Sequence, residues 1–170
     1  CTVRISSNKK AFAALKSDGS VKAWGDSGHG GTDPSISSGV VKISATTSNH
    51  GAAFAALKSD GSVQVWGGSN YGGSDPSIGA GTSCVYTNGE YVSGTGCVVK
   101  IYANDYAFAA LKSDGDIEVW GGGAYGGYLS GFTKGTNCVY ANGEYVSGVH
   151  CVISIFSTLQ AFALIKSNTG

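Results

Sequence analysis

Apolar and polar residues follow one pattern that recurs along the whole chain. The segment AFAALKSDG stands at 11–19, 53–61 and 107–115, and the variant AFALIKSNTG stands at 161–170. The marker phenylalanines are therefore 42, 54 and 54 residues apart. Such periods are typical of tandem architectures, in which each unit buries its apolar face only against its neighbours. We divide the chain into the end of a preceding repeat (1–10), repeat one (11–52), repeat two (53–106), repeat three (107–160) and the start of a fourth (161–170).

Three short apolar runs make up each repeat. An extended run precedes AFAALK by a few polar residues, as at 40–43, 98–102 and 152–156. A third run follows the Ser-Asp-Gly turn and alternates apolar and polar residues, as at 21–24, 63–66 and 117–120. Alternation with period two is typical of strands and not of helices. The pattern therefore predicts an all-β fold built from tandem units.

The turn after AFAALK predicts how the second and third runs pair. A two-residue loop would pair Leu15 with Lys22 and mix charged with apolar residues on one face. A three-residue loop, with its glycine left-handed, pairs Leu15 with Val21 and Phe12 with Trp24 instead. We therefore predict an aromatic pair in the core of each repeat: Phe12 with Trp24, Phe54 with Trp66, and Phe108 with Trp120. The turn residues are predicted to be structural and not catalytic, because aspartate can bond its own backbone there: Asp18, Gly19, Asp60, Gly61, Asp114 and Gly115.

Five cysteines bear on the compartment. Cys84 and Cys97 bracket the insert CVYTNGEYVSGTGC, and Cys138 and Cys151 bracket CVYANGEYVSGVHC. Repeat one lacks both the insert and its cysteines, so the members of each pair occur together, as disulfide partners do. Two free buried thiols are the alternative, and metal ligation lacks a second regular ligand pair. Two disulfides predict an oxidising compartment, and hence an extracellular or cell-surface protein.

The chain ends lie out of phase with the repeat. Cys1 aligns with Cys97 and Cys151, because each stands 11 residues before a marker phenylalanine. We therefore expect the partner of Cys1 to lie upstream, so that Cys1 is unpaired within this segment. On this reading the chain is a segment of a longer array.

The two inserts predict a further small hairpin each. Asn88-Gly89 and Asn142-Gly143 stand between Val-Tyr and Glu-Tyr-Val, a strong signal for a two-residue turn. Four tyrosines of these hairpins could form a binding surface or could pack across the strands of their own hairpin: Tyr86, Tyr91, Tyr140 and Tyr145.

Composition excludes several classes of partner. Lysine plus arginine equals aspartate plus glutamate at 11 each, and no basic cluster is present to neutralise phosphates, so we expect no nucleic-acid partner. No stretch approaches the roughly 20 apolar residues of a membrane span. Glycine is abundant, at 28 of 170 residues, and much of it follows the tryptophans, as in WGDSGHGGTDPS and WGGSNYGGSDPS. There a tight glycine pair lets the backbone turn sharply or approach a neighbouring unit.

The order of strand, ALKSDG, strand ending in WG and GG-bearing turn resembles the regulator of chromosome condensation type of repeat. LKSDGSVKAWGDS (15–27) and LKSDGSVQVWGGS (57–69) carry the resemblance most specifically. It implies antiparallel blades of three to four strands, in an open array or in part of a β-propeller. The family's usual glycine-glutamine-leucine-glycine stretch after the tryptophan is absent, and the cysteine-bracketed inserts are additional. The fold therefore transfers better than any activity.

Catalysis is not expected. His29, His50 and His150 occupy three different repeat positions, and the sequence offers no nucleophile with a supporting base. We also expect no cofactor and no metal. Our first hypothesis is a non-catalytic extracellular structural protein that self-associates through its repeats into a fibre or cell-surface appendage. The alternative is a closed propeller that binds a glycan or a cell-surface protein through rim loops.

Overall fold

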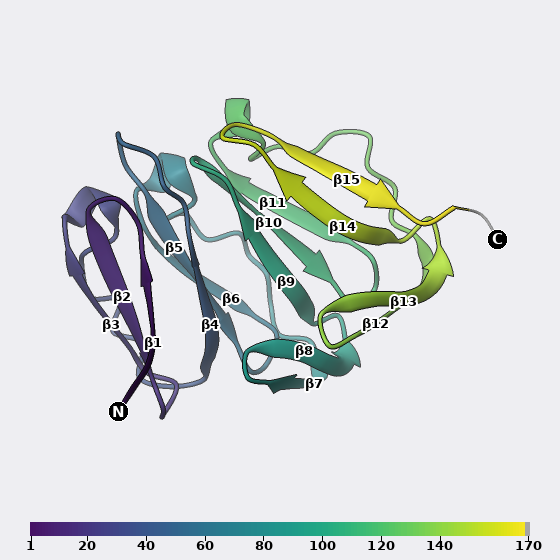
Figure 1. Cartoon of the computed structure of the whole chain (residues 1–170), viewed down its shortest axis with the longest axis horizontal. Coiled ribbons are helices and arrows are strands. Elements are labelled where there is room, and N and C mark those ends of the chain that lie inside the picture. Colours follow the sequence, from purple (N-terminus) through teal and green to yellow (C-terminus); the bar gives the residue numbers. More distant parts are fainter. Residues whose placement is uncertain (169–170) are drawn as a thin grey trace.

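The computed structural model describes residues 1–168 and is built almost entirely of β-strands. Fifteen strands and three single 3₁₀ turns occur in this part of the chain, which contains no α-helix. The strands form small antiparallel sheets that follow one another in sequence order and stand side by side like the ribs of a fan (Figure 1). The predicted all-β, blade-like fold is confirmed.

Four of the sheets are blades, which we number along the chain. Blades 1 to 3 have three strands each, and blade 4 has two within the described residues. Their strands are β1 (Thr2–Ser7), β2 (Ala11–Lys16) and β3 (Val21–Gly25) in blade 1; β4 (Val40–Ala45), β5 (Ala53–Lys58) and β6 (Val63–Gly67) in blade 2; β9 (Val98–Ala103), β10 (Ala107–Lys112) and β11 (Ile117–Gly121) in blade 3; and β14 (Val152–Ser157) and β15 (Phe162–Lys166) in blade 4.

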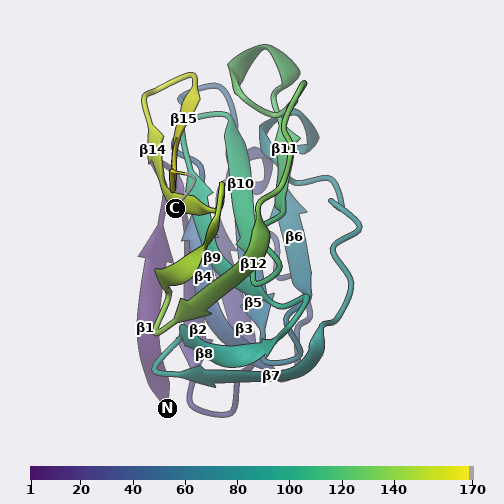
Figure 2. The ribbon, with the colours of Figure 1, turned by 90° about the vertical axis from the view of Figure 1, so that its right-hand side faces the viewer.

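Two hairpins lie outside the blades and correspond to the cysteine-bracketed inserts. Hairpin 1 consists of β7 (Thr82–Thr87) and β8 (Glu90–Thr95), and hairpin 2 of β12 (Thr136–Ala141) and β13 (Glu144–Val149). Both lie across the lower edge of the fan (Figures 1 and 2). Asn88 and Gly89 form the turn of hairpin 1 with φ of 53° and 83°, as the Asn-Gly signal predicted.

The predicted register of the central hairpin is confirmed in every three-stranded blade. Leu15 lies opposite Val21 and Phe12 opposite Trp24, and the same pairs recur in β5–β6 and β10–β11. Gly19 in the intervening turn has a φ of 76°, so its backbone is left-handed. Turn chemistry and side-chain alternation thus fix the register together.

The alternation in AFAALK explains why the blades stack. Ala11, Ala13 and Leu15 point toward blade 2, where they meet Phe54 and Ala56. The same two sets of positions meet again between blades 2 and 3 and between blades 3 and 4. Each blade therefore has a back face of small residues toward its successor and a front face carrying the aromatic pair toward its predecessor.

The blades are offset by one strand from the repeats defined in the sequence. Strand β4 belongs to repeat one by sequence phase, but it pairs with β5 in the sheet of repeat two. Residues 2–7, assigned by phase to a preceding repeat, likewise form the first strand of blade 1. A tandem repeat can be divided at any point of its period, and strand pairing places the division before the extended run.

Candidate functional site

The aromatic pair of each blade is the centre of the blade-to-blade contact. Phe54 and Trp66 stack with ring centroids 5.2 Å apart, and Phe108 and Trp120 do so at the same distance. Both phenylalanines are fully buried, and the two tryptophans are 8% and 7% exposed. These four residues are core, as predicted, because the preceding blade covers them.

Each buried aromatic pair packs against a glycine of the preceding blade. The crossings after the tryptophans form 3₁₀ turns that end at left-handed glycines: η1 (Ser27–His29) at Gly30, η2 (Ser69–Tyr71) at Gly72 and η3 (Gly123–Tyr125) at Gly126. A Cβ atom on Gly30 would lie 2.7 Å from Cδ2 of Phe54, and one on Gly72 would lie 2.5 Å from Cδ2 of Phe108. The first glycine of each pair thus allows close approach of the next blade.

The second glycine of the pair closes the turn itself. A Cβ atom on Gly31 would lie 2.3 Å from the carbonyl carbon of Gly25, and Gly73 and Gly127 stand in the same relation to their own blades. The sequence predicted that the glycine pair permits either a close approach to a neighbouring unit or a sharp turn. The first glycine permits the approach and the second permits the turn.

Blade 1 presents its front face uncovered. Phe12 and Trp24 stack with centroids 5.6 Å apart, yet each is 44% exposed, so the first aromatic pair is not buried in this chain. This corrects the expectation that all three pairs are core: the pair is buried only where a preceding blade supplies the cover. Val3 and Ile5, on the neighbouring strand, are exposed as well.

The opposite end of the fan presents an uncovered back face. Ala161, Ala163 and Ile165 occupy the positions of Ala11, Ala13 and Leu15, but they are exposed. Phe156 lies opposite Ala163 on the same face and is 55% exposed. The front face of blade 1 and the back face of blade 4 are thus the two halves of the contact that joins consecutive blades.

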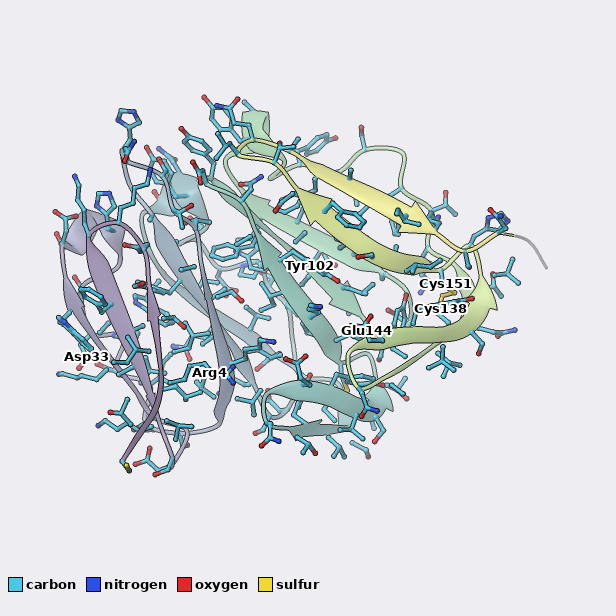
Figure 3. The ribbon with its side chains drawn as sticks, in the orientation of Figure 1. Arg4, Asp33, Tyr102, Cys138, Glu144 and Cys151 are labelled. Atoms are coloured by element: carbon cyan, nitrogen blue, oxygen red, sulfur yellow. A yellow bond between two sulfur atoms is a disulfide. The ribbon has the colours of Figure 1, made fainter. Side chains whose placement is uncertain are left out.

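Both predicted disulfides are present. Cys84 bonds to Cys97 and Cys138 to Cys151, with Cα atoms 5.8 and 5.6 Å apart (Figure 3). A Cβ atom on Gly61 would lie 2.7 Å from the sulfur of Cys84, and one on Gly115 would lie 2.4 Å from that of Cys138. Each disulfide therefore joins the two ends of its hairpin and packs against the turn of the preceding blade. Cys1 is a free, exposed thiol in the described chain.

The four hairpin tyrosines are structural, so their suggested role as a binding surface is not supported. Tyr91 and Tyr140 are only 3% and 4% exposed, and each packs edge-on against its cross-strand partner, Tyr86 or Tyr145. The hydroxyls of Tyr86 and Tyr140 donate to the carbonyls of Val98 and Val152, at 2.6 and 2.8 Å. Because these rings fill the space between hairpin and blade, little of them faces solvent. Burial raises the pKa of Tyr140 to about 12.

The turn aspartates cap their own turns. The amides of Ser20, Ser62 and Asp116 donate to the carboxylates of Asp18, Asp60 and Asp114, at 2.9, 3.0 and 3.2 Å. The hydroxyl of Ser62, followed by its amide, lowers the pKa of Asp60 despite some desolvation. Hydrogen-bonded carboxylates that stay charged suit turns and not proton transfer.

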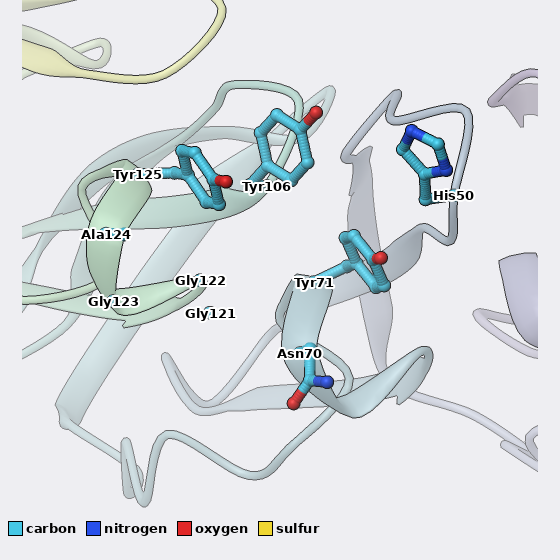
Figure 4. Close-up of a pocket in the computed structure, with 9 residues that line it drawn as sticks. All are labelled: His50, Asn70, Tyr71, Tyr106, Gly121, Gly122, Gly123, Ala124 and Tyr125. Carbon is cyan, nitrogen blue, oxygen red and sulfur yellow. The ribbon is translucent and has the colours of Figure 1, made fainter.

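A tyrosine-lined cleft between blades 2 and 3 was not predicted from the sequence. Tyr71 comes from η2, Tyr106 from the residue before β10 and Tyr125 from η3 (Figure 4). The centroids of Tyr106 and Tyr125 are 4.2 Å apart in a stack, and Tyr71 lies 5.9 Å from Tyr106. With His50, Asn70 and the backbone of 121–124 they surround a cavity of about 510 Å³. The only sequence signal was the aromatic residue that precedes each glycine pair.

Within residues 1–168 no three histidine, cysteine, aspartate or glutamate side chains converge on a point that could hold a metal ion. His29 is buried with its Nδ1 atom 2.6 Å from Asp26, while His50 and His150 are exposed. The same residues contain no helix of the length and apolarity that crossing a bilayer requires.

Comparisons with known proteins give fold similarity only. No family model and no curated protein matches the chain. The CRINKLY WD40 ectodomain of the Arabidopsis thaliana receptor kinase ACR4 shares 18% identity at a TM-score of 0.41, over 69% of this chain and 35% of that one. Human WBSCR16 shares 20% identity at a TM-score of 0.49, over 98% of this chain and 45% of that one. The computationally designed Ika8 protein shares 14% identity at a TM-score of 0.32, over 96% and 70%. The chain thus spans less than half of the first two structures.

Proposed function

We propose that this chain is a non-catalytic structural repeat protein whose blades extend by stacking into an extracellular array. The observation that carries the proposal is that the two end faces repeat the two halves of the contact by which the blades of this chain stack. The front face of blade 1 offers Phe12 and Trp24, and the back face of blade 4 offers Ala163, Ile165 and Phe156. Inside the chain the same kinds of face bury each other completely.

The occupant proposed for the front face is the back face of another such blade, either in a neighbouring repeat of a longer array or in a second copy of this segment. A contact between two different faces is heterologous, so it continues as a filament, or closes into a ring where the rotation per blade permits. Exposed apolar surface of this kind is typical of association sites. The repeats, with their Asp-Gly turns and Trp-Gly strand ends, are proposed to be of the regulator of chromosome condensation type.

An oxidising location is part of the proposal. The two disulfides close the bases of both hairpins and are compatible with an extracellular protein. An array outside the cell has no glutathione pool to reduce them. The balanced charge also suits stacking, because copies without net charge do not repel one another.

Two variants, each blocked at one end, test the proposal. Phe12→Ser combined with Trp24→Ser changes only the front face, and Ala163→Glu changes only the back face. Sedimentation equilibrium of the unaltered chain is expected to show a mass that rises with concentration, and each blocked variant alone is expected to remain monomeric. An equimolar mixture of the two is expected to stop at dimers, because one free front meets one free back.

Val85→Ser provides the matched control. Val85 and its counterpart Val139 are 46% and 48% exposed, so stacking does not cover this position, and the change should leave association intact. Electron microscopy of the unaltered chain should show elongated or curved assemblies. Isolated compact particles at every concentration, or association of the back-blocked variant with itself, would overturn the proposal.

A further inference from the structure

The cleft lined by Tyr71, Tyr106 and Tyr125 lies between blades 2 and 3, apart from the buried aromatic pairs. Its three rings are half-buried, and their hydroxyls make no hydrogen bond within the described chain. The side chains of His50 and Asn70, which are exposed at the same cleft, are also without a partner in residues 1–168. Five polar side chains therefore line one cavity without a hydrogen bond to another described residue.

Buried polar side chains hold the backbone of the two outer tyrosines in place. The hydroxyl of Thr46, which is fully buried, donates to the carbonyl of Tyr71 at 3.1 Å. The amide of Asn104, 5% exposed, donates to the carbonyl of Tyr125 at 2.8 Å. The ring of Tyr71 also rests on Gly51, where a Cβ atom would lie 2.4 Å from Cε2 of the ring. A site fixed before the ligand arrives loses less entropy on binding.

The glycine segment of the cleft leaves the backbone open at Gly123. Gly121, Gly122 and Gly123 line one side, and a Cβ atom on Gly123 would meet nothing within 4 Å. Gly122 lies against the rings, since a Cβ atom on it would be 3.0 Å from Cδ2 of Tyr125, so a ligand would meet open peptide groups at Gly123 beside the tyrosines (Figure 4). The volume, about 510 Å³, is within the usual range of small-ligand sites.

We propose that this cleft binds neutral sugar residues of a glycan. One face of a pyranose ring consists of C–H groups that pack on an aromatic ring, and its hydroxyls radiate at the edge, where the phenols, the imidazole and the amide lie. Each of those groups both donates and accepts hydrogen bonds, as each sugar hydroxyl does. No charged side chain lines the cleft, so it matches uncharged sugars.

A proline-rich peptide is the competing occupant, since such peptides also dock in aromatic grooves. Its prolines offer carbonyl acceptors but no backbone N–H donors. The cleft presents acceptors as well as donors, and the acceptors would be left unpaired against such a segment. The observations therefore favour the sugar.

The chain itself supplies a matched set of variants. Tyr125→Ala and Asn70→Ala change the cleft, whereas Tyr128→Ala changes a tyrosine that is 76% exposed and lies outside it. The probes are an array of neutral and acidic oligosaccharides and a polyproline peptide, followed by calorimetric titration of the neutral oligosaccharide that gives the strongest signal. Asn70 is exposed, so its variant reports on binding even where Tyr125→Ala disturbs the packing of the stack.

The expected result is binding of at least one neutral oligosaccharide, weakened about tenfold or more by Tyr125→Ala and measurably by Asn70→Ala, with Tyr128→Ala unchanged. Absence of binding across the array, binding confined to acidic glycans, or a Tyr125-dependent response to polyproline alone would each overturn the proposal. The end-blocked variants that test stacking leave this cleft intact, so the two proposals fail separately.

Discussion

The indole N–H of Trp66 donates a hydrogen bond of 3.0 Å to the carbonyl oxygen of Gly30, 36 residues earlier and in the preceding blade. The indole of Trp120 makes the same bond to Gly72, at 3.1 Å. Blades 2 and 3 are thus each attached to the preceding blade by a buried polar bond at the centre of an apolar contact. The bond fixes the position of one blade on the next, because the donor has no alternative partner there.

Trp66→Phe should therefore destabilise the chain more than the same change in blade 1. It removes the donor and leaves the Gly30 carbonyl buried without its partner, a loss of about 1 kcal/mol or more in the free energy of unfolding. Trp24 is 44% exposed and has no such bond, so Trp24→Phe should change stability by less than about 0.5 kcal/mol. Urea unfolding of both variants gives the comparison. Equal losses would show that the bond is not what distinguishes the two positions.

The contrast between these tryptophans shows what the sequence could predict. The pairing of Phe12 with Trp24 depends on a local turn and on side-chain alternation, both readable from a few residues. Burial of the pair depends on whether another blade covers it. The pair of Phe12 and Trp24 is exposed and that of Phe54 and Trp66 is buried, although the phenylalanines lie in identical AFAALKSDG segments. The cleft joins Tyr71, Tyr106 and Tyr125 from separate segments, so its existence follows only from the stacking order. The sequence left two roles open for the insert tyrosines, binding or packing, because tertiary contacts decide how much of each ring the blade covers.

Gly72→Ala is predicted to disrupt the contact between blades 2 and 3. Gly72 has a φ of 98°, and an added Cβ atom would lie 2.5 Å from the buried ring of Phe108, which has no room to move. Backbone strain and the clash add, so the unfolding free energy should fall by more than about 1 kcal/mol.

Gly123→Ala is the matched control. Gly123 lies three residues before Gly126, which is the counterpart of Gly72 in blade 3. Gly123 is exposed, its φ is not in the left-handed region and its Cβ atom would meet nothing within 4 Å. The change should alter stability by less than about 0.5 kcal/mol. Thermal unfolding of both variants is the measurement. A Gly72→Ala variant as stable as the unaltered chain would contradict the close approach of Phe108 to Gly72.

Removal of one disulfide should loosen a hairpin and leave the blades in place. Cys84→Ala combined with Cys97→Ala frees the ends of hairpin 1 and should cost about 2–4 kcal/mol. The blade contacts through Trp66 and Trp120 involve neither sulfur. Hydrogen exchange should therefore accelerate in residues 82–95 before it does so in β5 and β10. Uniform acceleration throughout the chain would show that hairpin and blades unfold together.

Stability should also decline in alkali, because Tyr140 is harder to ionise in the folded chain than in the unfolded one. Burial raises its pKa from 10.0 to about 12, while its hydroxyl donates to the carbonyl of Val152. Its contribution is complete below pH 10, where both states are protonated, and is lost as the pH rises from 10 to about 12, where the unfolded state ionises first. Tyr140→Phe should be less stable than the unaltered chain at pH 8, and the difference should shrink toward pH 12. Urea midpoints across this range test the sign, and a difference that grows with pH would contradict it.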